Sequence, residues 1–106
     1  MMNILKSIFS NKDNTKMENL IKEGAFLVDV RTPAEFAEGN VYGSVNIPLD
    51  QIQQKLTQFK GKENIIVFCR SGARSAQAKS ILEQNGIANV TNGGSMQSVQ
   101  AMVQNG

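Results

Sequence analysis

A single cysteine, Cys69, is the residue of this chain best suited to nucleophilic chemistry. It directly follows an apolar run at residues 65–68, and two arginines, Arg70 and Arg74, come next in the sequence. The chain contains no histidine, so no Cys-His pair can activate the thiol by general-base catalysis. Any reactive thiolate must therefore be stabilised by nearby positive charge or by hydrogen-bond donors.

The residues after Cys69 predict a loop that leads into the N-terminus of a helix. Ser71, Gly72 and Ala73 are small, and the composition becomes helical from Ser75 onwards. The first N–H groups of a helix have no intrahelical partner, and a glycine lets the loop turn so that several of them converge. With the arginines, this arrangement is expected to lower the thiol pKa from ~8.5 to about 3.5–7.5. The alternative, an inert apolar cysteine, is less favoured because of the flanking arginines.

Length and composition indicate one domain that needs neither a disulfide nor a metal to fold. The chain has 106 residues and a net charge of +2, with no nucleic-acid or membrane signature. One cysteine excludes an internal disulfide, a Cys-x-x-Cys redox pair and a cysteine zinc cluster. We expect an N-terminal tail or short helix at residues 1–14 and a single domain at 15–106. The apolar stretch at the N-terminus is too short for a signal-peptide core, so a cytoplasmic location is expected.

Hydrophobic patterns predict strands that alternate with short helices. Strands are expected at 25–30, 45–47, 65–68 and 88–91, and helices at 15–23, 33–38, 49–59, 75–84 and after residue 94. The helix at 33–38 has the clearest start, because Thr32 and Glu35 form a capping box around Pro33. Alternation of this kind favours an α/β fold in which helices cover both faces of a parallel sheet.

Asp29 and Arg31 are expected at the carboxyl end of a buried strand. Open α/β sheets carry their sites at this edge. Two interpretations are open: the pair helps to shape a pocket, or Arg31 forms an ion pair with Glu35 that stabilises the following turn. The ion pair is the favoured interpretation, since the two residues lie only four positions apart.

Four sequence blocks form a pattern that is more specific together than any block alone. They are DVRTPAEF at residues 29–36, GNVYGSVNIP at 39–48, CRSGAR at 69–74 and NGG at 92–94. In this order and spacing they resemble the rhodanese family, and most of all its short thiosulfate sulfurtransferases of the phage-shock type. The resemblance implies a rhodanese-like three-layer fold with four or five parallel strands. Two features depart from the family: Asn40 stands where histidine is frequent, and no tryptophan follows the NGG block.

The resemblance also implies a sulfurtransferase with Cys69 as its catalytic residue. The Cys69 thiolate would attack the sulfane sulfur of thiosulfate, form a persulfide and release sulfite; cyanide, a thiol or a thioredoxin-like protein would accept the sulfur. Backbone N–H groups of the loop would hold the persulfide, and arginine side chains would bind the donor. The residues expected to bind substrate are Arg70, Ser71, Gly72, Ala73 and Arg74, with Asp29 and Arg31 in support. No metal, organic cofactor, nucleic acid or membrane is implied.

Two other classes of function remain open. A Cys-Arg phosphatase or arsenate reductase would use a similar loop, and a non-catalytic module would carry a persulfide or bind a partner. Arg74 follows Cys69 by five positions, one fewer than the Cys-x-x-x-x-x-Arg spacing of the phosphatases. The spacing therefore argues against the phosphatase, whereas the sequence does not separate an enzyme from a binding module.

Overall fold

The structure is a computed structural model of the chain and describes residues 15–105. The tail or short helix expected at residues 1–14 lies outside the described residues. A four-stranded parallel sheet forms the centre, with strands β1 (Phe26–Asp29), β2 (Val45–Asn46), β3 (Ile65–Cys69) and β4 (Val90–Ser95). The strand order is β2-β1-β3-β4. The predicted α/β fold with a parallel sheet is confirmed.

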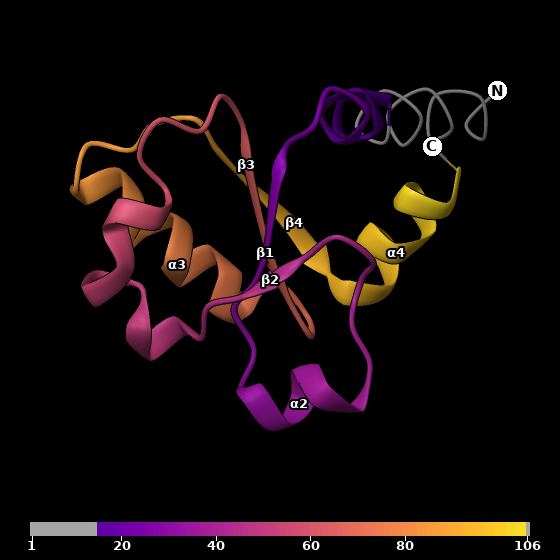
Figure 1. The fold of residues 1–106 in the computed structure, drawn as a ribbon, viewed down its shortest axis with the longest axis horizontal. Helices are drawn as coiled ribbons and strands as arrows, with labels where there is room; N and C mark the ends of the chain where they lie inside the picture. Colours follow the sequence, from indigo (N-terminus) through magenta and orange to yellow (C-terminus); the bar gives the residue numbers. More distant parts are fainter. Residues whose placement is uncertain (1–14, 106) are drawn as a thin grey trace, which may run out of the picture.

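Strand β3 is buried on both faces because helices cover both sides of the sheet (Figure 1). One core cluster combines the odd-numbered residues of β3 with the inner side of α3 (Ala73–Gln84). The other contains Ile66 and Phe68 together with Val99 of α4 (Met96–Asn105). The two-residue period of a strand sends alternate side chains to opposite faces. This explains why residues 65–68 form an unbroken apolar run.

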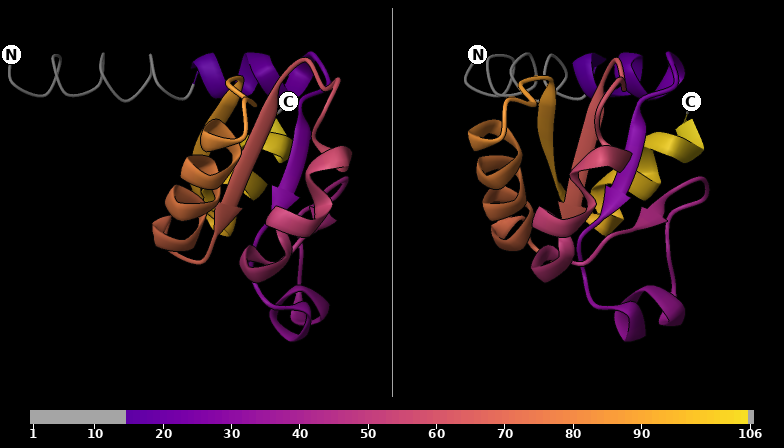
Figure 2. Two further views of the ribbon diagram at one scale, coloured as in Figure 1. Left: turned by 90° about the vertical axis from the view of Figure 1, so that its left-hand side faces the viewer. Right: turned by 60° about the vertical axis from the view of Figure 1, so that its left-hand side comes forward.

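Residues 15–22 form a helix on the same face of the sheet as α4 (Figure 2). The apolar side chains of this helix that join the second core cluster are Met17, Leu20 and Ile21. Gly24, the predicted stop, has a φ of 91°. On α4, Val99 and Met102 are buried, so its methionine-containing stripe serves the core. No helix within residues 15–105 is long and apolar enough to cross a membrane.

Helix α2 (Pro33–Glu38) lies beyond the carboxyl end of the sheet and has no buried residue (Figure 1). It begins as predicted, because Thr32 accepts a hydrogen bond from the Glu35 N–H and the Glu35 carboxylate accepts one from the Thr32 N–H. Gly39 ends the helix. Since α2 buries no side chain, its position depends largely on polar contacts.

The segment expected as one helix at 49–59 consists of two 3-10 helices, η1 (Leu49–Gln51) and η2 (Gln53–Gln58). Lys55 interrupts η2 with a φ of −118° and a ψ of 28°. Apolar residues in this segment come in pairs three positions apart, a spacing that suits the 3-10 helix as well as the α-helix. Ile52 and Phe59 are both buried. The prediction of a core-facing segment is confirmed, whereas the prediction of an α-helix is wrong.

Strand β4 extends past residue 91, the predicted end, and includes Gly93 and Gly94. The sequence assigns these glycines to a turn before the last helix, which is wrong. The register with β3 shifts here, so that Gly93 is the extra residue of a β-bulge. A Cβ atom at Gly93 would lie 2.8 Å from Cγ2 of Ile66 and 3.0 Å from Cγ2 of Val99. Close packing of β4 against β3 and α4 therefore requires a glycine at this position.

Candidate active site

The carboxyl ends of β1 and β3 lie at one edge of the sheet, where their last residues are Asp29 and Cys69. Parallel pairing places Asp29 opposite Phe68, the neighbour of Cys69. Helix α2 extends beyond this same edge (Figure 2). The structure thus brings Asp29 and the cysteine loop together at the edge that the sequence predicts for the site.

The Cys69 sulfur lies in a cradle formed by residues 69–75, which we call the sulfur cradle. Cys69 is only 1% exposed, and the N–H of Gly72 donates to its Sγ at 3.0 Å. Gly72 has a φ of 101°, a conformation that favours glycine. Helix α3 begins at Ala73, two positions before the predicted start at Ser75, because Gly72 already serves as its N-cap. The first turn of α3 therefore belongs to the cradle.

Hydrogen bonds within the sulfur cradle keep the pKa of the thiol near neutrality. Burial raises the pKa of Cys69, but hydrogen bonds from the Ser75 hydroxyl and from the N–H groups of Ser75, Ser71 and Gly72 outweigh it and lower the pKa to about 7. The value lies within the range that the sequence predicts. The main causes are more local than expected, since hydrogen-bond donors of the cradle lower the pKa more than the arginines do.

Two residues outside the predicted site, Ser75 and Asn92, complete the surroundings of the sulfur. The Ser75 hydroxyl oxygen lies 3.4 Å from the Cys69 sulfur and 2.7 Å from Oδ1 of Asn92. The Asn92 amide also donates to the Gly72 carbonyl at 3.1 Å. Both residues stand beside recognisable blocks, since Ser75 follows CRSGAR and Asn92 begins NGG. Ser75 and Asn92 come together because β4 pairs with β3, and local sequence patterns do not predict this pairing.

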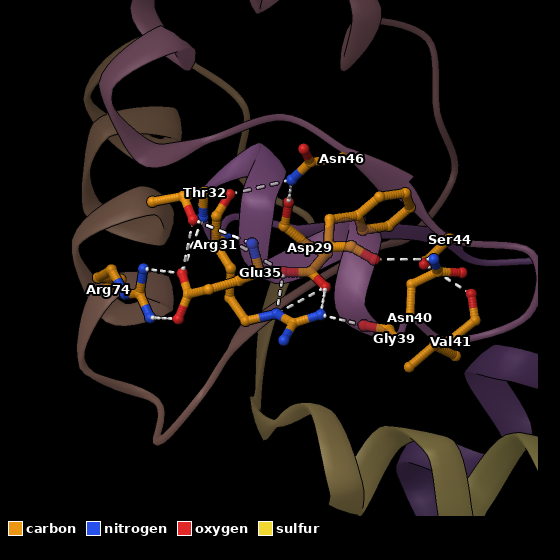
Figure 3. A network of polar contacts seen from close by, with 11 residues as sticks. Asp29, Arg31, Thr32, Glu35, Gly39, Asn40, Val41, Ser44, Asn46 and Arg74 are labelled. Carbon is orange, nitrogen blue, oxygen red and sulfur yellow. Dashed lines mark hydrogen bonds and ion pairs between the residues drawn. The ribbon is translucent and has the colours of Figure 1, made fainter.

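Arg74 forms a two-bond ion pair with Glu35 of α2, at 2.8 and 3.0 Å (Figure 3). The Arg74 hydrogen bonds lower the pKa of Glu35 to about 2, and those of Glu35 raise the pKa of Arg74. The paired geometry fixes the direction of the guanidinium. Arg74 therefore faces α2. The structure does not place Arg70 and Arg74 in the same pocket, although the sequence predicts that both bind the donor.

Arg31 pairs with Asp29 rather than with Glu35 (Figure 3). Its Nη2 lies 2.7 Å from the Asp29 carboxylate and also donates to the Gly39 carbonyl at 2.7 Å. The Asp29 side chain is fully buried, and a buried carboxylate needs a charged or hydrogen-bonding partner. The favoured prediction of an Arg31–Glu35 ion pair is therefore wrong. Arg31 instead connects the end of β1 to the end of α2.

A pocket of about 190 Å³ lies between α2, the start of α4 and the sulfur cradle. Its lining residues are Arg31, Glu35, Glu38, Gly39, Arg70, Met96 and Gln97. Arg70 belongs to both the pocket and the cradle, and no carboxylate within residues 15–105 lies at ion-pair distance from it. The pocket also contains Arg31, so the alternative in which Arg31 helps to shape a pocket is supported. Two glutamates accompany the two arginines, which gives the pocket mixed charge.

The remaining predicted residues act through the backbone or lie farther out. The side chains of Ser71 and Ala73 are exposed, and Ser71 contributes its main-chain N–H to the lowered pKa of Cys69. Asn40, which replaces the histidine expected from the resemblance, is exposed and donates to the Phe36 carbonyl at 2.9 Å. This departure therefore affects the end of α2 and not the sulfur cradle.

The arrangement provides a thiolate nucleophile with hydrogen-bond donors around it and arginines near it. Such a thiolate can attack an electrophilic sulfur or carbon, and N–H groups at a helix start stabilise the resulting anion. Among residues 15–105, no group of three or more His, Cys, Asp or Glu side chains has the arrangement of metal ligands.

Comparisons with known proteins find relatives that match most of this chain. The model of the rhodanese-like domain matches residues 13–101. A sulfurtransferase of Allochromatium vinosum is 39% identical over 70 residues, which cover 66% of this chain and 65% of that protein. The thiosulfate sulfurtransferase PspE of Escherichia coli is 32% identical, with 68% of this chain and 71% of that protein covered. The chain thus spans less than two thirds of the Allochromatium relative.

A solved structure shares the fold as well as part of the sequence. The rhodanese-like domain protein from Staphylococcus aureus superimposes with a TM-score of 0.69 and 34% identity, over 80% of this chain and 85% of that one. It agrees with the three-layer arrangement around a parallel sheet. On the evidence of the family model, the sequence relatives and the fold, this chain belongs to the rhodanese-like domain family.

Proposed function

We propose that this protein is a sulfurtransferase that moves the sulfane sulfur of thiosulfate, or of a related donor, to a thiophilic acceptor through a persulfide on Cys69. The observation that carries the proposal is the buried sulfur, which accepts the Gly72 N–H at 3.0 Å and has a pKa lowered to about 7. Relatives named as sulfurtransferases support the same reaction class.

In the first half-reaction, the Cys69 thiolate attacks the outer sulfur of thiosulfate. A bond forms between Sγ and that sulfur, the S–S bond of thiosulfate breaks, and its electron pair leaves with sulfite. The negative charge of the persulfide then lies on the outer sulfur, where N–H groups at the start of α3 can stabilise it. The donor is a dianion, and Arg70 is the lining residue best placed to bind it by charge-assisted hydrogen bonds.

In the second half-reaction, cyanide or the thiolate of an acceptor attacks the outer sulfur. The bond to Sγ breaks, and Cys69 leaves as a thiolate with the electron pair. A thiol of lowered pKa is a better leaving group than an ordinary cysteine. The hydrogen bonds that lower the pKa of Cys69 to about 7 therefore favour this step as well.

The proposal is tested by the intact mass of the protein after thiosulfate and then after a thiol. We expect the mass of one sulfur atom to be gained and then lost, with neither change in Cys69→Ala. Steady-state turnover with thiosulfate and cyanide should follow ping-pong kinetics, because the sulfur remains on the enzyme between substrates. Loading without turnover would instead favour a persulfide-carrying module, and normal turnover of Cys69→Ala would refute the mechanism.

A phosphatase reaction is the alternative that this geometry supports less. A transferred phosphoryl group carries three equatorial oxygens that all require donors, whereas Arg74 is held by Glu35 at 2.8 Å. We expect negligible hydrolysis of aryl phosphates beside clear sulfur transfer. If aryl phosphates were hydrolysed faster than sulfur is transferred, the phosphatase would become the favoured function.

A further inference from the structure

Ser75 has three hydrogen-bond acceptors around its hydroxyl group but only one proton to donate. The acceptors are Oδ1 of Asn92 at 2.7 Å, the Gly72 carbonyl at 3.1 Å and the Cys69 sulfur at 3.4 Å. Ser75 is 0% exposed, so bulk water does not supply a missing donor. The sulfur, the amide oxygen and the carbonyl oxygen therefore compete for one hydroxyl proton.

Backbone groups at both ends fix the orientation of the Asn92 amide. Its Nδ2 donates to the Gly72 carbonyl at 3.1 Å, and its Oδ1 accepts the N–H of Gly94 at 2.9 Å. A flipped amide would place two donors together at Gly94 and two acceptors together at Gly72. Asn92 therefore presents an acceptor, and never a donor, to the Ser75 hydroxyl.

We propose that Asn92 is a positioning residue that competes with the Cys69 sulfur for the Ser75 proton and thereby sets how readily the thiolate forms. In the neutral state, the thiol proton of Cys69 points to the Ser75 oxygen, and the Ser75 proton points to Asn92. When the thiol ionises, the Ser75 proton turns to the sulfur. Asn92 Oδ1 then keeps only the Gly94 N–H, and this loss opposes ionisation.

Five charged side chains lie around this end of the sheet. They are Arg70 in the loop, Arg74 on α3, Glu35 on α2, Asp29 at the end of β1 and Arg31 after β1. Strand β4, which carries Asn92, has no titratable side chain. Replacing Asn92 by an uncharged residue therefore removes its hydrogen bonds with Ser75, Gly72 and Gly94 without changing any charge.

The role of Asn92 deepens the proposed function, and its importance for turnover rests on that function. In the sulfur-transfer cycle, Sγ is a thiolate when empty and carries no net charge when it bears the outer sulfur. The Ser75 proton would turn to the sulfur in the first state and to Asn92 in the second. The competition itself is measurable on Cys69 without any sulfur donor, so its failure is distinguishable from failure of sulfur transfer.

The test measures the rate of Cys69 alkylation by iodoacetamide from about pH 5 to about pH 9 in Ser75→Ala and Asn92→Leu variants. Ser75→Ala removes the donor, so we expect a higher pKa and an alkylation rate about tenfold lower near pH 6. Asn92→Leu keeps the approximate shape and removes the competing acceptor, so we expect a lower pKa and a rate about threefold higher near pH 6. The two shifts have opposite signs.

Opposite signs separate this role from simple structural damage, which would move both variants toward the free-thiol pKa of ~8.5. Ser75→Thr should stay near the native profile because it keeps the hydroxyl, and Ser80→Ala serves as the control for an exposed serine of the same helix. In the double variant, Asn92→Leu should have no effect beyond that of Ser75→Ala. A pKa that is unchanged or raised in Asn92→Leu, or in Asn92→Ala if the leucine variant does not fold by circular dichroism, overturns the proposal.

Discussion

The sulfur cradle and the segment at residues 31–40, which we call the α2 arm, border the same pocket but are held in different ways. In the cradle, Cys69 and Ser75 are almost fully buried, and hydrogen bonds join them to β4. The α2 helix within the arm has no buried residue. It is held by the Arg74–Glu35 ion pair and by the bond from Arg31 to the Gly39 carbonyl.

This difference assigns different tasks to the two regions. A buried network holds its groups in one geometry, and leaving one member unpaired is costly. An ion pair that is a quarter to a third exposed, as between Arg74 and Glu35, contributes modestly and is weakened by salt. We therefore expect changes to the buried groups of the cradle to alter the chemistry at the sulfur, and changes in the α2 arm to alter how the donor binds.

The largest effect is expected from one glycine inserted after Ser71, within the sulfur cradle. The longer loop moves the N–H of Gly72 away from the sulfur, which it now contacts at 3.0 Å. Misplacement by about 1 Å costs a reaction roughly 100-fold, so thiosulfate:cyanide turnover should fall by about that factor. The fold should persist, since a longer surface loop adds little closure entropy.

A glycine inserted after Tyr42 provides the matched control in the turn that follows the α2 arm. Tyr42 is 86% exposed, and its side chain is not part of the core. Turnover of this control should stay within a few-fold of the native value. Undiminished sulfur transfer in the Ser71 insertion would show that loop length does not determine the chemistry.

Arg70→Ala and Arg74→Ala should differ, although the sequence predicts one shared role. Arg70 lines the pocket and has no carboxylate partner within residues 15–105. Its loss should lower kcat/KM for thiosulfate by an amount that corresponds to about 1.5–3 kcal/mol of activation free energy. Arg74 is committed to Glu35, so its replacement should have a smaller effect. Arg70→Lys keeps the charge and tests whether the paired geometry of a guanidinium matters. Equal losses in both alanine variants would show that Arg74 also binds the donor.

Local sequence patterns predicted the parts of the site that form within a few residues. The capping box at Thr32 and Glu35 and the turn at Gly72 were both predicted correctly, because each depends on one residue type at one position. The partner of Arg31 was predicted wrongly. Its ionic partner follows from the burial of the Asp29 carboxylate, and the two-bond geometry cannot be deduced from spacing alone.

The long-range parts of the site could not be predicted from local patterns. Arg74 and Glu35 are 39 positions apart, and Ser75 and Asn92 are 17 apart. Their meeting depends on the strand order and on the bulge at Gly93, where the register of β4 shifts. A glycine pair in the sequence fits a turn as well as a bulge, and only close packing against β3 separates these two structures.

The sulfur cradle and the α2 arm should also respond differently to pH. Hydrogen bonds favour the thiolate and lower the pKa of Cys69 to about 7, so the reactive form decreases as pH falls through that value. The alkylation rate should therefore drop about tenfold between roughly pH 8 and pH 6. The ion pair of the α2 arm should stay intact over this range, because Arg74 lowers the pKa of Glu35 to about 2. A midpoint near ~8.5 would show that the cradle does not stabilise the thiolate.

The smallest effect is expected from Glu35→Gln, which changes the α2 arm and leaves the buried groups of the sulfur cradle, Cys69 and Ser75, unchanged. Glutamine retains the capping interaction with Thr32, so the start of α2 should be preserved. The change removes one negative charge from the pocket and frees Arg74. We therefore expect kcat/KM for thiosulfate to rise about two- to fivefold at low ionic strength, with less gain in salt.

Glu38→Gln is the matched control for this last change, because Glu38 lines the same pocket but is not the partner of Arg74. If the benefit comes only from removing negative charge, both variants should gain equally. If it comes from releasing Arg74, Glu35→Gln should gain more, and a Glu35→Gln, Arg74→Ala double variant should lose that advantage. A fall in kcat/KM for Glu35→Gln, with an unchanged alkylation profile of Cys69, would show that the ion pair is needed to hold the α2 arm in position for the donor.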